Sequence, residues 1–188
     1  MKRNLTSQLL DWIDKPNRKP LVLRGARQVG KTWLVRDFAQ RAKLRLIELN
    51  FEKQIEFVSL FESNDPKKIL QLLEAHLRTT IVADQTLLFL DEIQAAPELL
   101  AKLRWFKEDM PEIAVIATGS LLDFALENHQ FSMPVGRISY LHLEPLSFFE
   151  FLHAIGEEKL CRVLKEITLD DALDRSLHNR CLELLTTY

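Results

Sequence analysis

Residues 21–32 read LVLRGARQVGKT, a short apolar run followed by a loop that opens on glycine and ends in glycine, lysine and threonine. The octet at 25–32 fits the pattern Gly-x-x-x-x-Gly-Lys-Ser/Thr, and helical spacing begins directly after it. Glycines let backbone amides curl around a phosphate, where the helix N-terminus adds partial positive charge. The stretch therefore predicts a strand, a phosphate-binding loop and a helix. The alternative is an ordinary turn with a surface lysine, which would not require a strand before it and a helix after it.

Individual side chains of this loop have expected roles. Lys31 is expected to reach the β- and γ-phosphates of a nucleotide, and the Thr32 hydroxyl to ligate magnesium. For Arg27 and Gln28, contact with phosphate, contact with a partner and no direct role all stay open. The predicted nucleotide-binding residues are Gly25, Ala26, Arg27, Gln28, Val29, Gly30, Lys31, Thr32 and Trp33.

Two acids follow a second apolar run. Residues 87–92 read LLFLDE, which places both carboxylates at the carboxyl end of a buried strand, the edge at which α/β sheets bind ligands. Asp91 is predicted to hold magnesium through a water, and Glu92 to polarise the attacking water as a general base. Alone, the two acids would equally suit a helix N-terminus. Their pairing with the loop at 25–32 favours the metal and water site.

A third strand ends in small polar residues. Residues 113–120 read IAVIATGS, and a polar side chain at this tip is expected beside Asp91, where it would bond the γ-phosphate or the attacking water. Ser120 and Thr118 are both candidates. Capping of a following helix by Ser120 is the competing interpretation.

Apolar runs alternate with helical spacing along most of the chain. Runs that are apolar on both faces suit buried parallel strands, and intervening helices then predict a doubly wound α/β sheet. From residue 147 onward only helical patterns appear. We therefore expect a core over 1–146 and a helical extension over 147–188. The predicted strands are 21–24, 44–49, 87–90, 113–117 and 138–143.

Helix starts are marked by proline. Asp65 before Pro66 predicts an N-cap and a first helical position, and Pro97 is expected to open another helix in the same way. The buried faces predicted for three helices are Trp33, Leu34, Phe38 and Ala39; Ile69, Leu70, Leu73 and Leu77; and Leu99, Leu100, Leu103 and Phe106.

Composition narrows the class of protein. The net charge of −2 gives no overall attraction to nucleic acid, which is thus neither implied nor excluded. Cys161 and Cys181 form no zinc-binding pattern and are expected as buried thiols. No apolar run is long enough to span a bilayer, and the N-terminus is an amphipathic helix without a secretory pattern, so we expect a cytoplasmic protein with no membrane partner.

With these motifs in place, the chain resembles the AAA-like ATPase domain at the front of a large group of bacterial and archaeal proteins. The matching segments are RGARQVGKT, LLFLDEIQ, VIATGS and VGRISYLHLEPLSFFEF, which span most of residues 20–151. The resemblance implies ATP as the nucleotide and a P-loop NTPase three-layer sandwich with strand order 5-1-4-3-2. Members typically carry a second domain, often compared with restriction-endonuclease folds. We expect residues 147–188 to lead toward such a domain, and we expect this sequence to lack the domain itself.

The resemblance assigns roles to two further residues. Asn50 ends the second strand, where AAA-type proteins often hold a polar residue that bonds the catalytic glutamate and keeps it idle; a turn residue is the alternative. Arg137 lies before the fifth strand, where such proteins place an arginine that reaches the γ-phosphate of a neighbouring subunit. A surface arginine or a structural salt bridge is the alternative for Arg137.

Three functions fit these residues. The first is an ATP-hydrolysing, magnesium-dependent module that drives or regulates a partner protein, a further domain or other copies of itself, with Lys31, Glu92, Ser120, Asn50 and Arg137 as the catalytic set. The second is a P-loop kinase, which would be expected to show an arginine-rich lid that is not evident. The third is a scaffold that binds ATP without turnover. The acidic pair at 91–92 favours hydrolysis.

Overall fold

The computed structural model describes residues 2–120, 136–168 and 171–188. Their contacts divide into two compact units, one of Leu5–Glu144 and the other of Met1–Asn4 with Pro145–Tyr188. Within the described residues, no helix has both the length and the apolar character required to cross a membrane.

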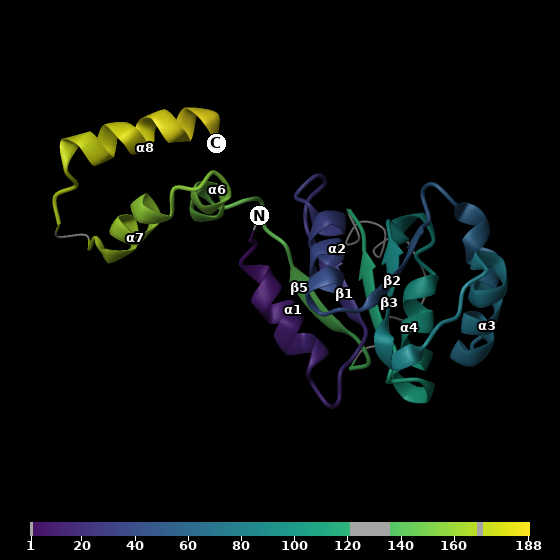
Figure 1. The fold of residues 1–188 in the computed structure, drawn as a ribbon. Coiled ribbons are helices and arrows are strands. Elements are labelled where there is room, and N and C mark those ends of the chain that lie inside the picture. Colours follow the sequence, from purple (N-terminus) through teal and green to yellow (C-terminus); the bar gives the residue numbers. More distant parts are fainter. Residues whose placement is uncertain (1, 121–135, 169–170) are drawn as a thin grey trace. The chain divides into compact units, whose positions relative to one another are not determined.

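The larger unit is built on a parallel sheet of five strands in the order β2-β3-β4-β1-β5 (Figure 1). This order is the predicted one, read from the opposite edge, and the mainly parallel α/β sandwich is confirmed. The strand bounds differ from the prediction by a residue or so at several ends. The strands are β1 (Leu21–Arg24), β2 (Arg45–Asn50), β3 (Thr86–Asp91), β4 (Ala114–Thr118) and β5 (Ser139–His142).

Helices cover both faces of this sheet. Because strand side chains alternate between faces, β3 contributes Leu87 and Phe89 to one core and Leu88 and Leu90 to the other. The first core packs against α1 (Leu5–Ile13) and α2 (Lys31–Arg41), and the second against α3 (Pro66–Leu77) and α4 (Leu99–Asp109). Short 3-10 turns complete the unit at η1 (Ile55–Phe61), η2 (Ala83–Gln85) and η3 (Ile93–Ala95).

Local sequence signals mark the starts of α3 and α4. Asp65 caps α3 by accepting a hydrogen bond from the amide of Lys67, and Pro66 occupies the first helical position, as predicted. Pro97 lies two residues before α4, whose cap is Glu98. The predicted inner faces of α3 and α4 are buried, except that Leu77 is only partly so.

One predicted core residue lies outside the core. Trp33 is 37% exposed, whereas Leu34, Val35 and Phe38 of the same helix are fully buried. A helix turns 100° per residue, so Trp33 lies at the border of the buried stripe, and the packing of α2 on the sheet selects Leu34 and Val35 instead. Trp33 therefore remains accessible one position beyond the phosphate loop.

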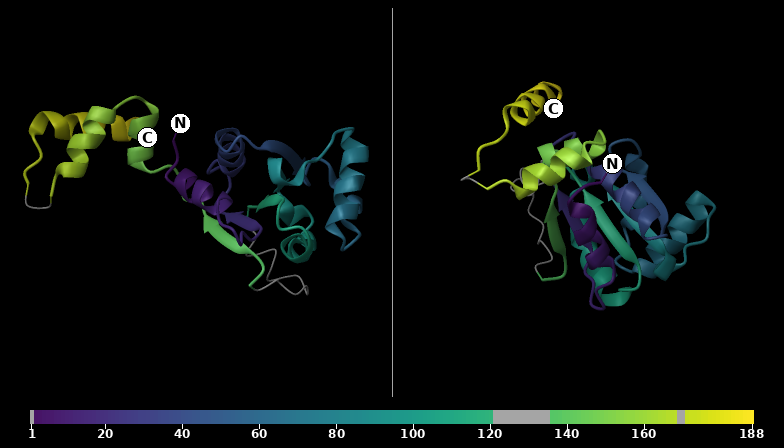
Figure 2. Two further views of the ribbon diagram at one scale, coloured as in Figure 1. Left: turned by 60° about the horizontal axis from the view of Figure 1, so that its bottom comes forward. Right: turned by 60° about the vertical axis from the view of Figure 1, so that its left-hand side comes forward.

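The smaller unit is helical, with α6 (Phe148–Ala154), α7 (Glu158–Glu166) and α8 (Arg175–Thr187) around a small apolar core (Figure 2). Ser147 and Glu150 form a reciprocal capping box at the start of α6. The Arg3 guanidinium ion-pairs with Glu150 at 3.0 Å, and the Asn4 amide donates to the same carboxylate at 2.6 Å. These contacts hold the first residues of the chain against α6.

Candidate functional site

The loop between β1 and α2 has the backbone shape needed to surround an anion. Gly25 has φ +147°, and a Cβ atom there would lie 2.4 Å from the carbonyl oxygen of Leu143, so only glycine fits. Gln28 and Gly30 also have positive φ, at 65° and 93°. Among the described residues no side chain caps α2 at Gly30, which leaves the first amides of that helix open to a ligand.

Lys31 is held within this loop. Its ammonium group donates to the carbonyl oxygens of Gly25 and Ala26 at 2.9 and 2.8 Å, and to the Ser120 hydroxyl at 3.4 Å. The side chain is only 6% exposed. Burial lowers the pKa of Lys31, while the charges of Glu92 and then Asp91 act in the opposite direction. The charge of this buried cation is thus favoured by the two acids at the end of β3.

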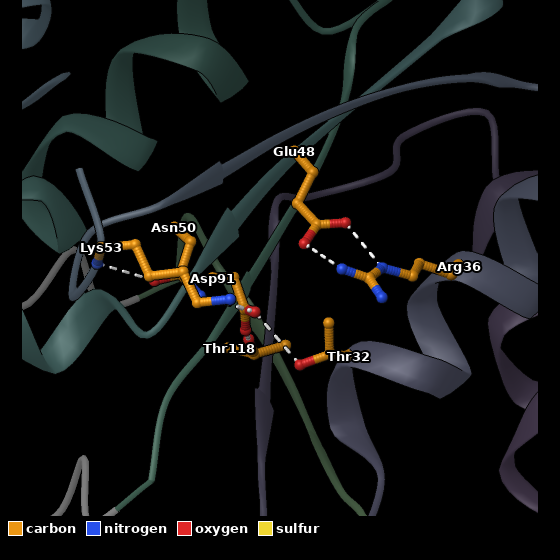
Figure 3. Close-up of polar contacts among 7 residues, drawn as sticks. All are labelled: Thr32, Arg36, Glu48, Asn50, Lys53, Asp91 and Thr118. Atoms are coloured by element: carbon orange, nitrogen blue, oxygen red, sulfur yellow. Dashed lines mark hydrogen bonds and ion pairs between the residues drawn. The ribbon is translucent and has the colours of Figure 1, made fainter.

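Asp91 is the centre of a hydrogen-bonded cluster at the carboxyl ends of the strands (Figure 3). Its carboxylate accepts from Thr32 at 3.1 Å, from the Asn50 amide at 3.2 Å and from the Thr118 hydroxyl. The donors come from α2, β2 and β4, and Asp91 as a residue is 2% exposed. The three donors stabilise a buried negative charge that would otherwise be costly.

The pair of Asp91 and Thr32 suits magnesium. Mg²⁺ prefers oxygen ligands, and it is usually bound by one or two carboxylates together with phosphate oxygens and water. Within the described residues, groups of three or more His, Cys, Asp or Glu that could enclose a metal are absent. Thr32 and Asp91 could supply oxygen ligands to a magnesium ion, with water and phosphate oxygens as the others.

Glu92 leaves the strand in a different direction. Its backbone is in the left-handed region, at φ 53° and ψ 46°, which separates it from the row of Asp91. Its carboxylate accepts a hydrogen bond from the side-chain amide of Gln94 at 2.7 Å. The same amide nitrogen donates to Glu52 at 2.9 Å.

The hydrogen-bond partners of Asp91 and Glu92 differ from those expected from the sequence. Asn50 was expected to bond Glu92, but its amide donates to Asp91, and its oxygen accepts from the Lys53 amide at 3.0 Å. Of the two candidates on the third motif, Thr118 bonds Asp91 and Ser120 contacts Lys31. A helix capped by Ser120 would fall on residues 121–135, outside the described residues.

The reason lies in the register of the sheet. Asn50 is aligned with Asp91 across β2 and β3, and Leu90 with Ala117 across β3 and β4. Continuing that register places Asp91 next to Thr118. Aligned residues of neighbouring strands point to the same face, so Asp91 meets Asn50 and Thr118, whereas Glu92 has already turned away.

Arg137 lies away from the site of its own chain. It precedes β5, whose Ser139 is aligned with Leu21 at the amino end of β1, whereas the phosphate loop follows the carboxyl end of β1. Its guanidinium is 51% exposed and ion-pairs with Glu108 at 2.7 Å. A γ-phosphate contact by Arg137 would therefore have to be made to a second copy. Arg27 and Gln28 are exposed at the tip of the loop.

Two residues of the site were not singled out as candidates from the sequence. Gln94 binds Glu92, and Glu52 shares its amide. The segment LLFLDEIQ contains Gln94 two positions after the expected base, a spacing at which a side chain can fold back across a tight turn. No comparable signal marks Glu52, because its contact depends on how β2 and β3 pair.

The chain matches one family of known proteins. Residues 17–152 match the model of a family described as an AAA domain. The matched range begins before β1, ends within α6 and contains every site residue discussed above. A search of curated proteins found no match to the chain.

Proposed function

The chain belongs to the AAA domain family, and on that premise we propose that it binds ATP with magnesium through the loop at 25–32 and hydrolyses it with Glu92 as the general base. One observation carries the proposal. The hydroxyl of Thr32, directly after the loop lysine, donates to Asp91 at the end of a different strand. The phosphate loop and the acidic strand end therefore form one site.

Each residue has a defined task in this proposal. The open amides of α2 bind the β-phosphate, and Lys31 leaves the carbonyl oxygens of Gly25 and Ala26 to bind the β- and γ-phosphates. Magnesium held by Thr32 and Asp91 would neutralise charge on the phosphate oxygens. Ser120, which contacts Lys31, is positioned to donate to the γ-phosphate or the attacking water.

Glu92 accepts the proton of the attacking water. The charge of Glu92 acts on the pKa of Lys31 in the loop, in the direction that raises it. One of its oxygens is occupied by Gln94, and the other is left for a water. Hydrolysis is proposed to drive or regulate a partner protein or a further domain.

The test combines binding and turnover. Lys31→Ala should abolish binding of a fluorescent ATP analogue. Glu92→Gln should bind it at least as well as the unchanged chain while phosphate release falls by about 100-fold or more. The matched control is Glu112→Gln, an exposed acid on the loop before β4, which should change neither measurement.

Other outcomes point to other functions. Nucleotide binding without phosphate release from the unchanged chain, also at high protein concentration, would favour a nucleotide-dependent scaffold. Transfer of radiolabelled phosphate to a small acceptor, in place of release as inorganic phosphate, would favour a kinase.

A further inference from the structure

The side chain of Gln94 connects two carboxylates near the phosphate loop. Its amide nitrogen donates to Glu92 at 2.7 Å and to Glu52 at 2.9 Å. An amide nitrogen has two protons, so one serves each acid and neither is left for another acceptor. The orientation of Glu92 therefore depends on an amide that Glu52 also uses.

The side-chain oxygen of Gln94 shows that this orientation of the amide has an energetic cost. This oxygen is buried and accepts no hydrogen bond from the residues that the structure describes. A buried acceptor without a donor costs free energy. Rotating the amide would not remove the cost, because the oxygen would then face two carboxylates. The acids thus determine how this side chain lies.

Glu52 is held near Gln94 by the backbone of its loop. The amide of Phe51 donates to the carbonyl oxygen of Asp91 at 3.1 Å, and the amide of Lys53 donates to the Asn50 side chain at 3.0 Å. These bonds fix both neighbours of Glu52 to the end of the sheet. The Glu52 side chain itself is exposed, so a cationic group from outside could reach it.

We propose that Gln94 is the positioning residue for Glu92, and that Glu52 anchors the amide of Gln94, so that the loop at 51–54 controls how firmly the general base is held. This inference rests on the proposed hydrolysis at Glu92. Each acid accepts one proton of the amide nitrogen, so a cation that draws the Glu52 carboxylate away leaves the amide free to rotate and Glu92 less firmly held. The loop thus provides a place where a basic group of a partner lowers turnover.

The kinetic test separates positioning from folding. In Gln94→Ala, kcat should fall by about 10-fold or more while KM changes less than about twofold, since the amide acts through Glu92 and not on the nucleotide. Gln94→Glu, which has the same shape but no donor when ionised, should be no better. In a Glu92→Gln background, Gln94→Ala should lower the residual rate no further. Gln71→Ala, at an exposed position of α3, is the matched control.

Glu52 carries its own expectation. Glu52→Ala should lower kcat by about threefold while KM changes little, because the amide of Gln94 then loses the acceptor that orients it toward Glu92. Glu56→Ala removes the same charge from an exposed position nearby and should leave kcat unchanged. An unchanged or higher kcat in Glu52→Ala would overturn the anchoring role of Glu52, and an unchanged kcat in Gln94→Ala would overturn the positioning role.

A measurement without turnover keeps the two proposals distinct. The NMR side-chain amide signal of Gln94, identified by its loss in Gln94→Ala, should show one proton shifted in Glu52→Ala and the other in Glu92→Ala, in the nucleotide-free protein. A signal that is unchanged in both variants overturns the shared amide. Absence of phosphate release together with the two shifts would refute the proposed hydrolysis and leave the shared amide supported.

Discussion

Asp91 shows how a single buried charge is made tolerable at a binding site. The residue is 2% exposed, and its carboxylate accepts hydrogen bonds from Thr32, Asn50 and Thr118. Each donor is also a residue of the phosphate loop or of a neighbouring strand end. The hydrogen bonds that offset the desolvation of the acid therefore also hold α2, β2 and β4 together around it.

Thr118→Val tests this role. The substitution keeps the shape and removes a donor to a buried carboxylate, so the free energy of unfolding should fall by about 2 kcal/mol in urea titrations. Thr86→Val is the matched control, because the Thr86 hydroxyl is also buried in a strand but has no partner among the described residues. Its stability should change by less than about 0.5 kcal/mol or rise. Equal losses in both variants would contradict the role of Thr118.

Gly25→Ala tests the shape of the loop. The new Cβ would lie 2.4 Å from the Leu143 carbonyl oxygen at a φ that alanine rarely adopts, so both strain and a backbone clash are introduced. We expect a loss of about 3 kcal/mol or more in the free energy of unfolding, and loss of ATP-analogue binding.

Gly136→Ala separates the two effects. Gly136 also has positive φ, at +76°, but its added Cβ would meet no atom within 4 Å. Gly136→Ala should lower the free energy of unfolding by only about 1 kcal/mol and leave nucleotide binding intact. A Gly25→Ala chain that binds nucleotide normally would show that the close approach to Leu143 is not required.

At the scale of elements, the start of α6 is held by a buried ion pair between Arg3 and Glu150. Arg3 and Glu150 are 2% and 7% exposed in their side chains, and Glu150 also accepts from the amides of Asn4 and Ser147. Burial by itself raises the pKa of Glu150, but the two amides and the guanidinium together outweigh it and leave the pKa below its ordinary value. The carboxylate is therefore stabilising only while it is ionised.

The pH dependence of this pair is testable. A lowered pKa contributes stability that is present above about pH 4.5 and lost as pH falls through the folded-state value. Glu150→Gln should lower the free energy of unfolding by about 2 kcal/mol or more at pH 7, and this difference from the unchanged chain should shrink as the pH falls below about 4.5. Urea unfolding followed by circular dichroism would measure it. A difference that is independent of pH would show that the charge of Glu150 does not matter.

At the scale of the whole molecule, the sheet separates Arg137 from the phosphate loop of the same chain. Arg137 precedes the amino end of β5, and the loop follows the carboxyl end of β1. If Arg137 stabilises the γ-phosphate in the transition state, it does so in a second copy. Arg137→Ala should then abolish turnover and spare ATP binding.

Mixing two inactive variants tests this arrangement. Arg137→Ala retains its loop, and Lys31→Ala retains its arginine, so a mixture should recover up to about a quarter of the activity when copies assemble at random. Arg104→Ala, at the other arginine that pairs with Glu108, is the control and should stay active alone. Normal turnover of Arg137→Ala would instead make its salt bridge with Glu108 purely structural.

The sequence by itself determined the phosphate loop, the strands, their parallel pairing through helices and the acids at the end of β3. These features are local: glycines at fixed spacing, apolar runs and the period of a helix are encoded in neighbouring residues. The Asp65 and Pro66 helix start was likewise readable, because a cap acts within one turn.

Only the tertiary structure decided which side chains meet. Asn50 and Thr118 bond Asp91 because strand register aligns them, and Glu92 pairs with Gln94 because its left-handed backbone turns it out of that row. Trp33 is exposed because the packing of α2 selects its neighbours. Which side chains meet depends on residues far apart along the chain. A shift of one residue in strand register, or a change in the backbone conformation of one residue, points a side chain to the other face.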